Sequence, residues 1–217
     1  MTIATYGDLK SAVASWLNRA NLTSQIPDFI TMGCARIYFG SQEPPFQTEP
    51  LRVRQMETDT TITINARSVA LPTRFLRVRA FSLTDYLGGP ALLPATPEYI
   101  RSNFTTQNAT GRPKYYSLEG ENFTFGPAPD GTYAADLLYY EQPAALSSDS
   151  DTNALLTANP TIYLAAAMIE AFVYARNNEQ AEFWHKKFVG AANAMQVSDD
   201  QDRYSGRWVA RSDTGNP

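Results

Sequence analysis

Acid–base and metal-dependent catalysis relies mainly on histidine, cysteine and clustered carboxylates, and this sequence contains few of these side chains. The chain has a single histidine, His185, and a single cysteine, Cys34. His185 lies in a predicted helix where Glu182, three residues earlier, is the carboxylate on its face, so we expect a surface histidine rather than a general base. Cys34 lies between Gly33 and Ala35, where we expect a small core thiol rather than a nucleophile. One histidine and one cysteine are too few for a zinc site.

Two pairs of carboxylates could provide the acid and the base of a glycoside hydrolase. Glu119 and Glu121 flank a predicted turn, and Asp199 and Asp200 lie in a polar C-terminal segment, where solvated charges are usual. No phosphate-binding loop or dinucleotide fingerprint occurs, and the pair Gly88–Gly89 is followed by a proline. We therefore expect no catalytic activity and no cofactor or metal, with a hydrolase acting on carbohydrate as an alternative.

Arginines are concentrated in one stretch of the chain. Residues 52–79 hold six arginines against two acids, so the local charge is 6 − 2 = +4. The simplest interpretation is a polar sheet face whose arginines pair with acids elsewhere. Two other interpretations are ion pairs between subunits, which suit the guanidinium fork, and a DNA-binding module. The six positions are Arg52, Arg54, Arg67, Arg74, Arg77 and Arg79.

Length and composition limit the class of protein. The 217 residues are 43% hydrophobic, which fits one or two globular domains. With 18 basic against 22 acidic residues the net charge is −4, which disfavours tight binding of nucleic-acid phosphates. The longest apolar run, residues 162–169, is far shorter than the roughly 20 residues that cross a bilayer, so we expect no membrane span. The N-terminal residues show no secretory signal.

Two helices are expected in the first 40 residues. Thr5 followed by Asp8 is typical of a capping box, so a helix should begin near Tyr6. Its apolar stripe comprises Leu9, Val13, Trp16 and Leu17.

The second helix has Thr23 and Ser24 as candidate caps and Pro27 in its first turn. One face carries Ile26, Phe29, Ile30, Gly33 and Ile37, and Gly33 would let another helix approach closely. The two helices are expected to form a hairpin.

The middle of the chain changes to strand patterns after a proline-rich connector at residues 42–50. Apolar and polar residues alternate in residues 60–64 and again in 75–81, where Leu76, Val78 and Ala80 should share the buried face. Further strands at 115–118, 122–125 and 132–140 are expected to form an antiparallel meander. A short helix should run from Pro97 to about residue 104.

Helical patterns return after residue 153. A long helix beginning at Asn159–Pro160 is apolar on nearly all sides, and Trp184, Phe188, Ala191 and Met195 form the stripe of a last helix. Because neither helical hairpin can bury its stripe alone, we expect an α+β fold. In it, the N- and C-terminal helices (residues 1–48 and 148–197) form one bundle, an antiparallel β domain (49–147) is inserted between them, and residues 198–217 form an extended tail.

Several short stretches stand in a distinctive order along nearly the whole chain: residues 6–10, 16–19, 26–30, 35–37, 54–57, 70–76, 111–116, 125–129, 138–140 and 155–164. Together they resemble the head-to-tail adaptor family of short-tailed bacteriophages. The resemblance implies a structural virion protein without catalytic activity, located at the head–tail junction and in the host cytoplasm during assembly. A ring of about twelve copies would join the portal protein to the tail nozzle or tail tube protein and continue the DNA channel.

The resemblance also implies a role for each part of the chain. The helices would build the ring, the β domain would face the tail, and the C-terminal segment would dock on the portal. Its aromatic and basic residues suit an interface and are the candidate portal-docking set: Tyr204, Arg207, Trp208 and Arg211.

Candidate inter-subunit or tail-facing residues are Arg52, Arg54, Arg77 and Arg79. A mildly acidic ring would repel phosphates, so DNA should pass without specific binding. The alternatives are a virion-associated hydrolase acting on carbohydrate and a DNA-binding module that uses residues 52–79.

Overall fold

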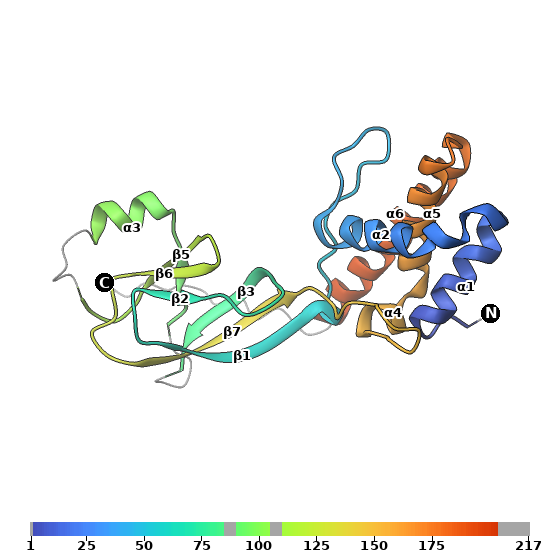
Figure 1. The fold of residues 1–217 in the computed structure, drawn as a ribbon. Helices are drawn as coiled ribbons and strands as arrows, with labels where there is room; N and C mark the ends of the chain where they lie inside the picture. The colour runs from blue at the N-terminus through green and yellow to red at the C-terminus, as the bar shows by residue number, and fades with distance from the viewer. Residues whose placement is uncertain (1, 85–89, 105–109, 204–217) are drawn as a thin grey trace. The chain divides into compact units, whose positions relative to one another are not determined.

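A computed structural model describes residues 2–84, 90–104 and 110–203 (Figure 1). The fold is α+β, as expected. The chain forms two compact units: a helical unit made of the described residues of 1–55 and 144–217, and a β unit of 56–143. The finer division of the chain at residues 48, 147 and 197 stays a prediction.

The helical unit begins with α1 (Tyr6–Leu17), which the expected capping box starts: the Thr5 hydroxyl accepts from the Asp8 amide, and the Asp8 carboxylate accepts from the Thr5 amide. Its stripe is buried except for Trp16, whose side chain is 56% exposed. Thr23 and Ser24 do not cap the next helix, because they lie inside a 3-10 helix, η1 (Ala20–Gln25), that leads directly into α2 (Ile26–Phe39).

The centre of the helical unit is α5 (Pro160–Tyr174), which packs against α2, α1, the short α4 (Ala154–Ala158) and α6 (Asn178–Arg203). The expected hairpin of the first two helices is not the main contact, because α2 packs chiefly on α5. A Cβ at Gly33 would lie 2.8 Å from the Ala167 amide nitrogen, so the close helix approach expected at Gly33 is confirmed. The last helix continues past Val197 to Arg203.

The β unit contains two sheets. In one, β7 (Tyr133–Glu141) lies between β1 (Glu57–Ile64) and β3 (Phe75–Leu83), and both pairs are antiparallel. The other has the order β2 (Ser68–Ala70), β6 (Asn122–Gly126), β5 (Tyr115–Glu119), β4 (Leu93–Pro94). The expected meander is correct for β5 and β6 alone, because β7 joins the first sheet and β4 pairs with β5 in parallel. The 3-10 helix η2 (Arg54–Met56) precedes β1.

Aromatic side chains dominate the core of the β unit, where Phe81, Phe123 and Phe125 are buried. The expected burial of Ala80 is wrong, and Leu76 is half-buried but lies outside the core cluster. Register shifts at Phe75/Arg77 and Val78/Ala80 change which residues face inward, so that Phe75, Val78, Phe81 and Leu83 meet the core and Ala80 is exposed.

The expected short helix is α3 (Pro97–Asn103), capped by the Thr96 hydroxyl. It packs against β5 and β6 through the buried Ile100. No helix in the described part of the chain is both long enough and apolar enough to span a bilayer.

Candidate functional site

The surroundings of His185 and Cys34 indicate that both side chains stabilise the fold. The His185 Nε2 lies 2.9 Å from the Gln47 carbonyl oxygen, so it donates a hydrogen bond to the connector at residues 42–50. Its ring also packs against Phe46. Burial raises the pKa of the Cys34 thiol to about 11, so the thiol is protonated at neutral pH and is a poor nucleophile. Among the described residues, no three potential metal ligands gather in one place.

The carboxylates singled out by sequence do not form an acid–base pair in a cleft. Glu119 accepts hydrogen bonds from Arg101 and Ser117. Although partial burial acts to raise it, these hydrogen bonds lower the pKa of Glu119 on balance. Asp199 is buried and bridges to Arg203 at 2.7 Å, while Asp200 is exposed. The arrangement therefore suits structural ion pairs better than glycoside hydrolysis.

A buried ion pair in the helical unit was missed by sequence reasoning. The Arg36 Nε donates to the Glu170 carboxylate at 2.7 Å, and its Nη1 donates to the Phe46 carbonyl at 2.6 Å. The two side chains are 6% and 11% exposed. The sequence pattern could have indicated this pair. Arg36 follows Phe29 and Gly33 at helical spacing on the buried face of α2, and Glu170 ends the apolar run of α5.

The buried Tyr38 and Tyr163 and the half-buried Asn153 form a polar network in the helical unit. The Tyr163 hydroxyl donates to the side-chain Oδ1 of Asn153 at 3.2 Å and lies 2.9 Å from the Tyr38 hydroxyl. Asn153 in turn caps α4. Burial raises the pKa of both phenols, that of Tyr163 to about 12, so they remain neutral hydrogen-bonding groups.

The arginines of residues 52–79 are divided between the two units. Arg52 donates to the carbonyls of Tyr38 and Leu51, and Arg54 pairs with Asp202, all in the helical unit. In the β unit Arg79 pairs with Glu57 and Arg74 with Glu141, which matches the expected polar sheet face. Arg77 is exposed and has no hydrogen bond or ion pair among the described residues. The structure does not bring the four candidates Arg52, Arg54, Arg77 and Arg79 into one patch of a single unit.

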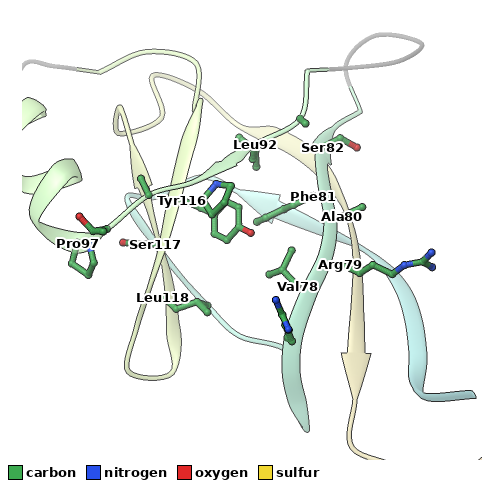
Figure 2. Close-up of a pocket in the computed structure, with 15 residues that line it drawn as sticks. Val78, Arg79, Ala80, Phe81, Ser82, Leu92, Pro97, Tyr116, Ser117 and Leu118 are labelled. Atoms are coloured by element: carbon green, nitrogen blue, oxygen red, sulfur yellow. The ribbon is translucent and has the colours of Figure 1, made fainter. Parts of the chain in front are cut away.

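An open groove of about 830 Å³ lies in the β unit, between β3 on one side and β4 and β5 on the other. Figure 2 shows Val78, Phe81 and Tyr116 pointing into this space, with Leu118 on the opposite wall and Arg79 pointing away. Burial raises the pKa of Tyr116, which keeps its phenol neutral. The described residues that line the groove include no carboxylate.

The helical unit carries a group of side chains that we call the aromatic cluster: the exposed rings of Trp16 and Phe183, the buried ring of Trp184 and the ammonium of Lys187. The rings of Trp16 and Trp184 meet edge-to-face at 5.3 Å. The Lys187 ammonium lies 5.6, 5.0 and 4.9 Å from the ring centres of Trp16, Trp184 and Phe183. Trp16 and Phe183 are 56% and 48% exposed, so the cluster presents large apolar area to solvent.

A second apolar surface, the α2 stripe, comprises Met32, Ala35 and Phe39. These residues lie at i, i+3 and i+7 on the side of α2 opposite its buried face. Met32 and Phe39 are 52% and 61% exposed. Exposed aromatic and methionine side chains of this kind are typical of protein–protein interfaces.

A comparison with known families identifies the family of this chain. Residues 4–211 match the family described as SU10 adaptor protein, so the match includes residues of both units. The chain belongs to this family. The resemblance to phage head-to-tail adaptors is thereby confirmed. No curated protein matches the chain.

Membership in a phage adaptor family supports a structural role in the virion and contacts with portal and tail proteins. The candidate portal-docking residues Tyr204, Arg207, Trp208 and Arg211 lie outside the described residues. Three surfaces of the described structure suit such contacts: the groove, the aromatic cluster and the α2 stripe.

Proposed function

We propose that this chain is the subunit of a ring that joins the portal to the tail and continues the DNA channel for retention and ejection of the genome. The observation that carries the proposal is the family match over residues 4–211. The lack of carboxylates among the described groove residues supports a binding role for the β unit over carbohydrate hydrolysis.

The helical unit is the part that builds the ring. A closed ring needs two different, complementary surfaces on every subunit. The aromatic cluster and the α2 stripe are two such surfaces, one on α1 and α6 and the other on α2. In a ring of about twelve copies, the aromatic cluster of one subunit packs on the α2 stripe of the next.

The β unit faces the tail nozzle or tail tube protein, and Arg77 and the groove are its binding surface. The C-terminal segment is the portal anchor, with Tyr204, Arg207, Trp208 and Arg211 as its contact residues. This assignment draws on their composition, since aromatic and arginine side chains are enriched among residues that dominate binding energy. Arg52, Arg54 and Arg79 serve contacts at subunit boundaries in addition to their internal ones.

DNA passes through the ring without specific binding. The net charge of −4 per subunit disfavours attraction of phosphates. The ion pairs of Arg54, Arg74 and Arg79 neutralise three of the six arginines in residues 52–79, which weakens the case for a DNA-binding module. DNA affinity that is negligible at physiological salt would agree with this proposal, whereas tight, steeply salt-dependent affinity would favour the DNA-binding alternative.

The experiment is to mix the purified chain with its cognate portal ring and to image the product by electron microscopy. A second chain ends at Arg203, which keeps α6 and the Arg54–Asp202 and Arg203–Asp199 ion pairs intact. We expect the full chain to stack on the portal as a ring and the shortened chain to fail. Stacking by both chains would place the anchor in the folded body, and no stacking by the full chain would contradict portal docking.

A further inference from the structure

We infer that the groove of the β unit accepts an extended acidic segment of the tail-side partner, which adds to the free edge of β3. The inference deepens the proposed function and rests on it. It depends on three observations: part of the edge of β3 is uncovered, the floor of the groove is apolar, and Arg77 has no hydrogen-bond or ion-pair partner among the described residues.

β3 is an edge strand that is covered over only part of its length. It pairs with β7 on one side. On the other side Ala91 bridges to Ser82, and the Leu92 amide donates to the Phe81 carbonyl at 2.8 Å. The chain then leaves β3 and forms β4, which pairs with β5. From Arg77 to Ala80 no described strand lies on the outer edge of β3.

The floor of the groove is the open end of the hydrophobic core. Phe81 and Tyr116 meet at 5.3 Å between ring centres, and both also pack on Phe123. Towards solvent the apolar surface continues to Val78 on the β3 wall and to Leu118, which is 48% exposed, on the β5 wall (Figure 2). A strand beside β3 would cover this surface with alternate side chains.

The charge beside this floor is positive. Arg77 lines the groove and lacks a hydrogen bond or ion pair among the described residues, whereas the neighbouring Arg79 is bound by Glu57. Side chains directly opposite each other in paired strands share one face of the sheet. An incoming strand would therefore place an acid opposite Arg77 and an apolar residue opposite Val78.

The occupant is a partner segment rather than the chain's own C-terminal segment. Residues 204–217 contain Arg207 and Arg211 against one acid, Asp213, so their charge has the same sign as that of Arg77. An acidic, alternating segment has the complementary charge. Edge-strand addition supplies backbone hydrogen bonds, while the apolar floor and Arg77 determine which sequence fits.

The test uses the full chain and two fluorescent peptides, one of four Asp-Val repeats and one of four Lys-Val repeats. Fluorescence anisotropy should show that the Asp-Val peptide binds and that the Lys-Val peptide does not. Arg77→Glu should weaken the Asp-Val peptide about tenfold, because it replaces an attraction with a repulsion. The charge-matched control is Lys114→Glu, which changes an exposed cation of the same unit outside the groove.

A second pair of variants tests the apolar floor. Leu118→Ser should weaken the Asp-Val peptide about fivefold, whereas Leu93→Ser should not, because Leu93 is similarly exposed (53%) but does not line the groove. Circular dichroism checks that each variant folds, and Arg77→Gln replaces Arg77→Glu if the latter does not.

Three outcomes would overturn the inference: no binding of the Asp-Val peptide, equal binding of both peptides, or unchanged binding by Arg77→Glu and Leu118→Ser. If Arg77→Glu self-associates differently from the unchanged chain in the absence of peptide, the groove forms contacts between copies of this chain instead. Stacking of the same variants on the portal is measured separately, so failure of the groove and failure of the adaptor role can be told apart.

Discussion

At the scale of single residues, the Arg36–Glu170 ion pair is the interaction whose loss should cost most. Both side chains are nearly buried, and Arg36 also binds the Phe46 carbonyl. Glu170→Gln leaves a buried guanidinium without its counter-charge, so the free energy of unfolding should fall by about 3 kcal/mol. Urea denaturation followed by circular dichroism measures this change.

The control for this prediction is an exposed pair on the same unit. Glu182 and Lys186 are 60% and 73% exposed in α6, so Glu182→Gln should change the stability by less than about 0.5 kcal/mol. The double variant Arg36→Met/Glu170→Leu should recover part of the lost stability, because it removes both charges. Equal effects of Glu170→Gln and Glu182→Gln would show that the buried pair has no special role.

The reactivity of Cys34 is a second prediction at this scale. Its pKa of about 11 lies above the ordinary value of 9.0, so at pH 7 only about one thiol in ten thousand is ionised. Alkylation by iodoacetamide should be slow at pH 7 in the folded protein and fast after unfolding at the same pH. Because the folded pKa is raised, this thiol also stabilises the fold below pH 9 and loses that contribution as the pH rises towards 11. Rapid alkylation of the folded protein at pH 7 would contradict this account.

Local sequence patterns predicted the contacts and burial of some side chains correctly and those of others incorrectly. Thr5 and Asp8 form the expected capping box because both partners lie within one turn of chain. The Tyr38–Tyr163 contact joins residues far apart in the sequence, so no local pattern indicates it. Trp16 follows the stripe of α1 by spacing, yet it is exposed and packs edge-to-face on Trp184 of α6.

At the scale of elements, the contact of α2 with α5 depends on a missing side chain. A Cβ at Gly33 would lie 2.8 Å from the Ala167 nitrogen and 2.9 Å from the Ala166 carbonyl carbon, and these backbone atoms cannot rotate away. Gly33→Ala should therefore reduce the stability by about 2 kcal/mol, since the two helices must separate. Thermal and urea unfolding measure the change.

The matched control is Gly190 in α6, where an added Cβ meets nothing within 4 Å. Gly190→Ala should raise the stability by about 0.5–1 kcal/mol, because alanine is the better helix former. A stable Gly33→Ala variant would mean that α2 and α5 do not pack as closely as described.

The limits of prediction also differ between elements. The alternation of apolar and polar residues predicted the strand β3 at the correct position in the chain. It could not reveal the register shifts that expose Ala80. Segment 20–25 forms a 3-10 helix that runs into α2, so Thr23 and Ser24 are not at a helix start. The parallel pairing of β4 involves only Leu93 and Pro94, which is too short for an alternating pattern.

At the scale of the whole molecule, the proposed ring makes the exposed apolar surfaces functional. Phe39→Ser should abolish ring formation on the portal, because it removes a 61% exposed ring from the α2 stripe. The folded subunit should lose less than about 1 kcal/mol of stability, since little buried area is lost. Electron microscopy with the portal and urea unfolding measure the two effects.

Val197→Ser is the control for the ring prediction, because Val197 is 56% exposed in the same unit but lies outside both apolar surfaces. This variant should still form rings. If Phe39→Ser forms rings as well as the unchanged chain does, the α2 stripe is not part of the subunit interface.

A cryo-electron-microscopy map of the neck of the assembled virion would show whether this chain forms the ring between portal and tail. We expect a closed ring of this chain in that position, with the helical units in contact around the ring and the β units on the tail side. A neck in which this chain is absent, or present as isolated copies that do not touch one another, would disprove the proposed ring.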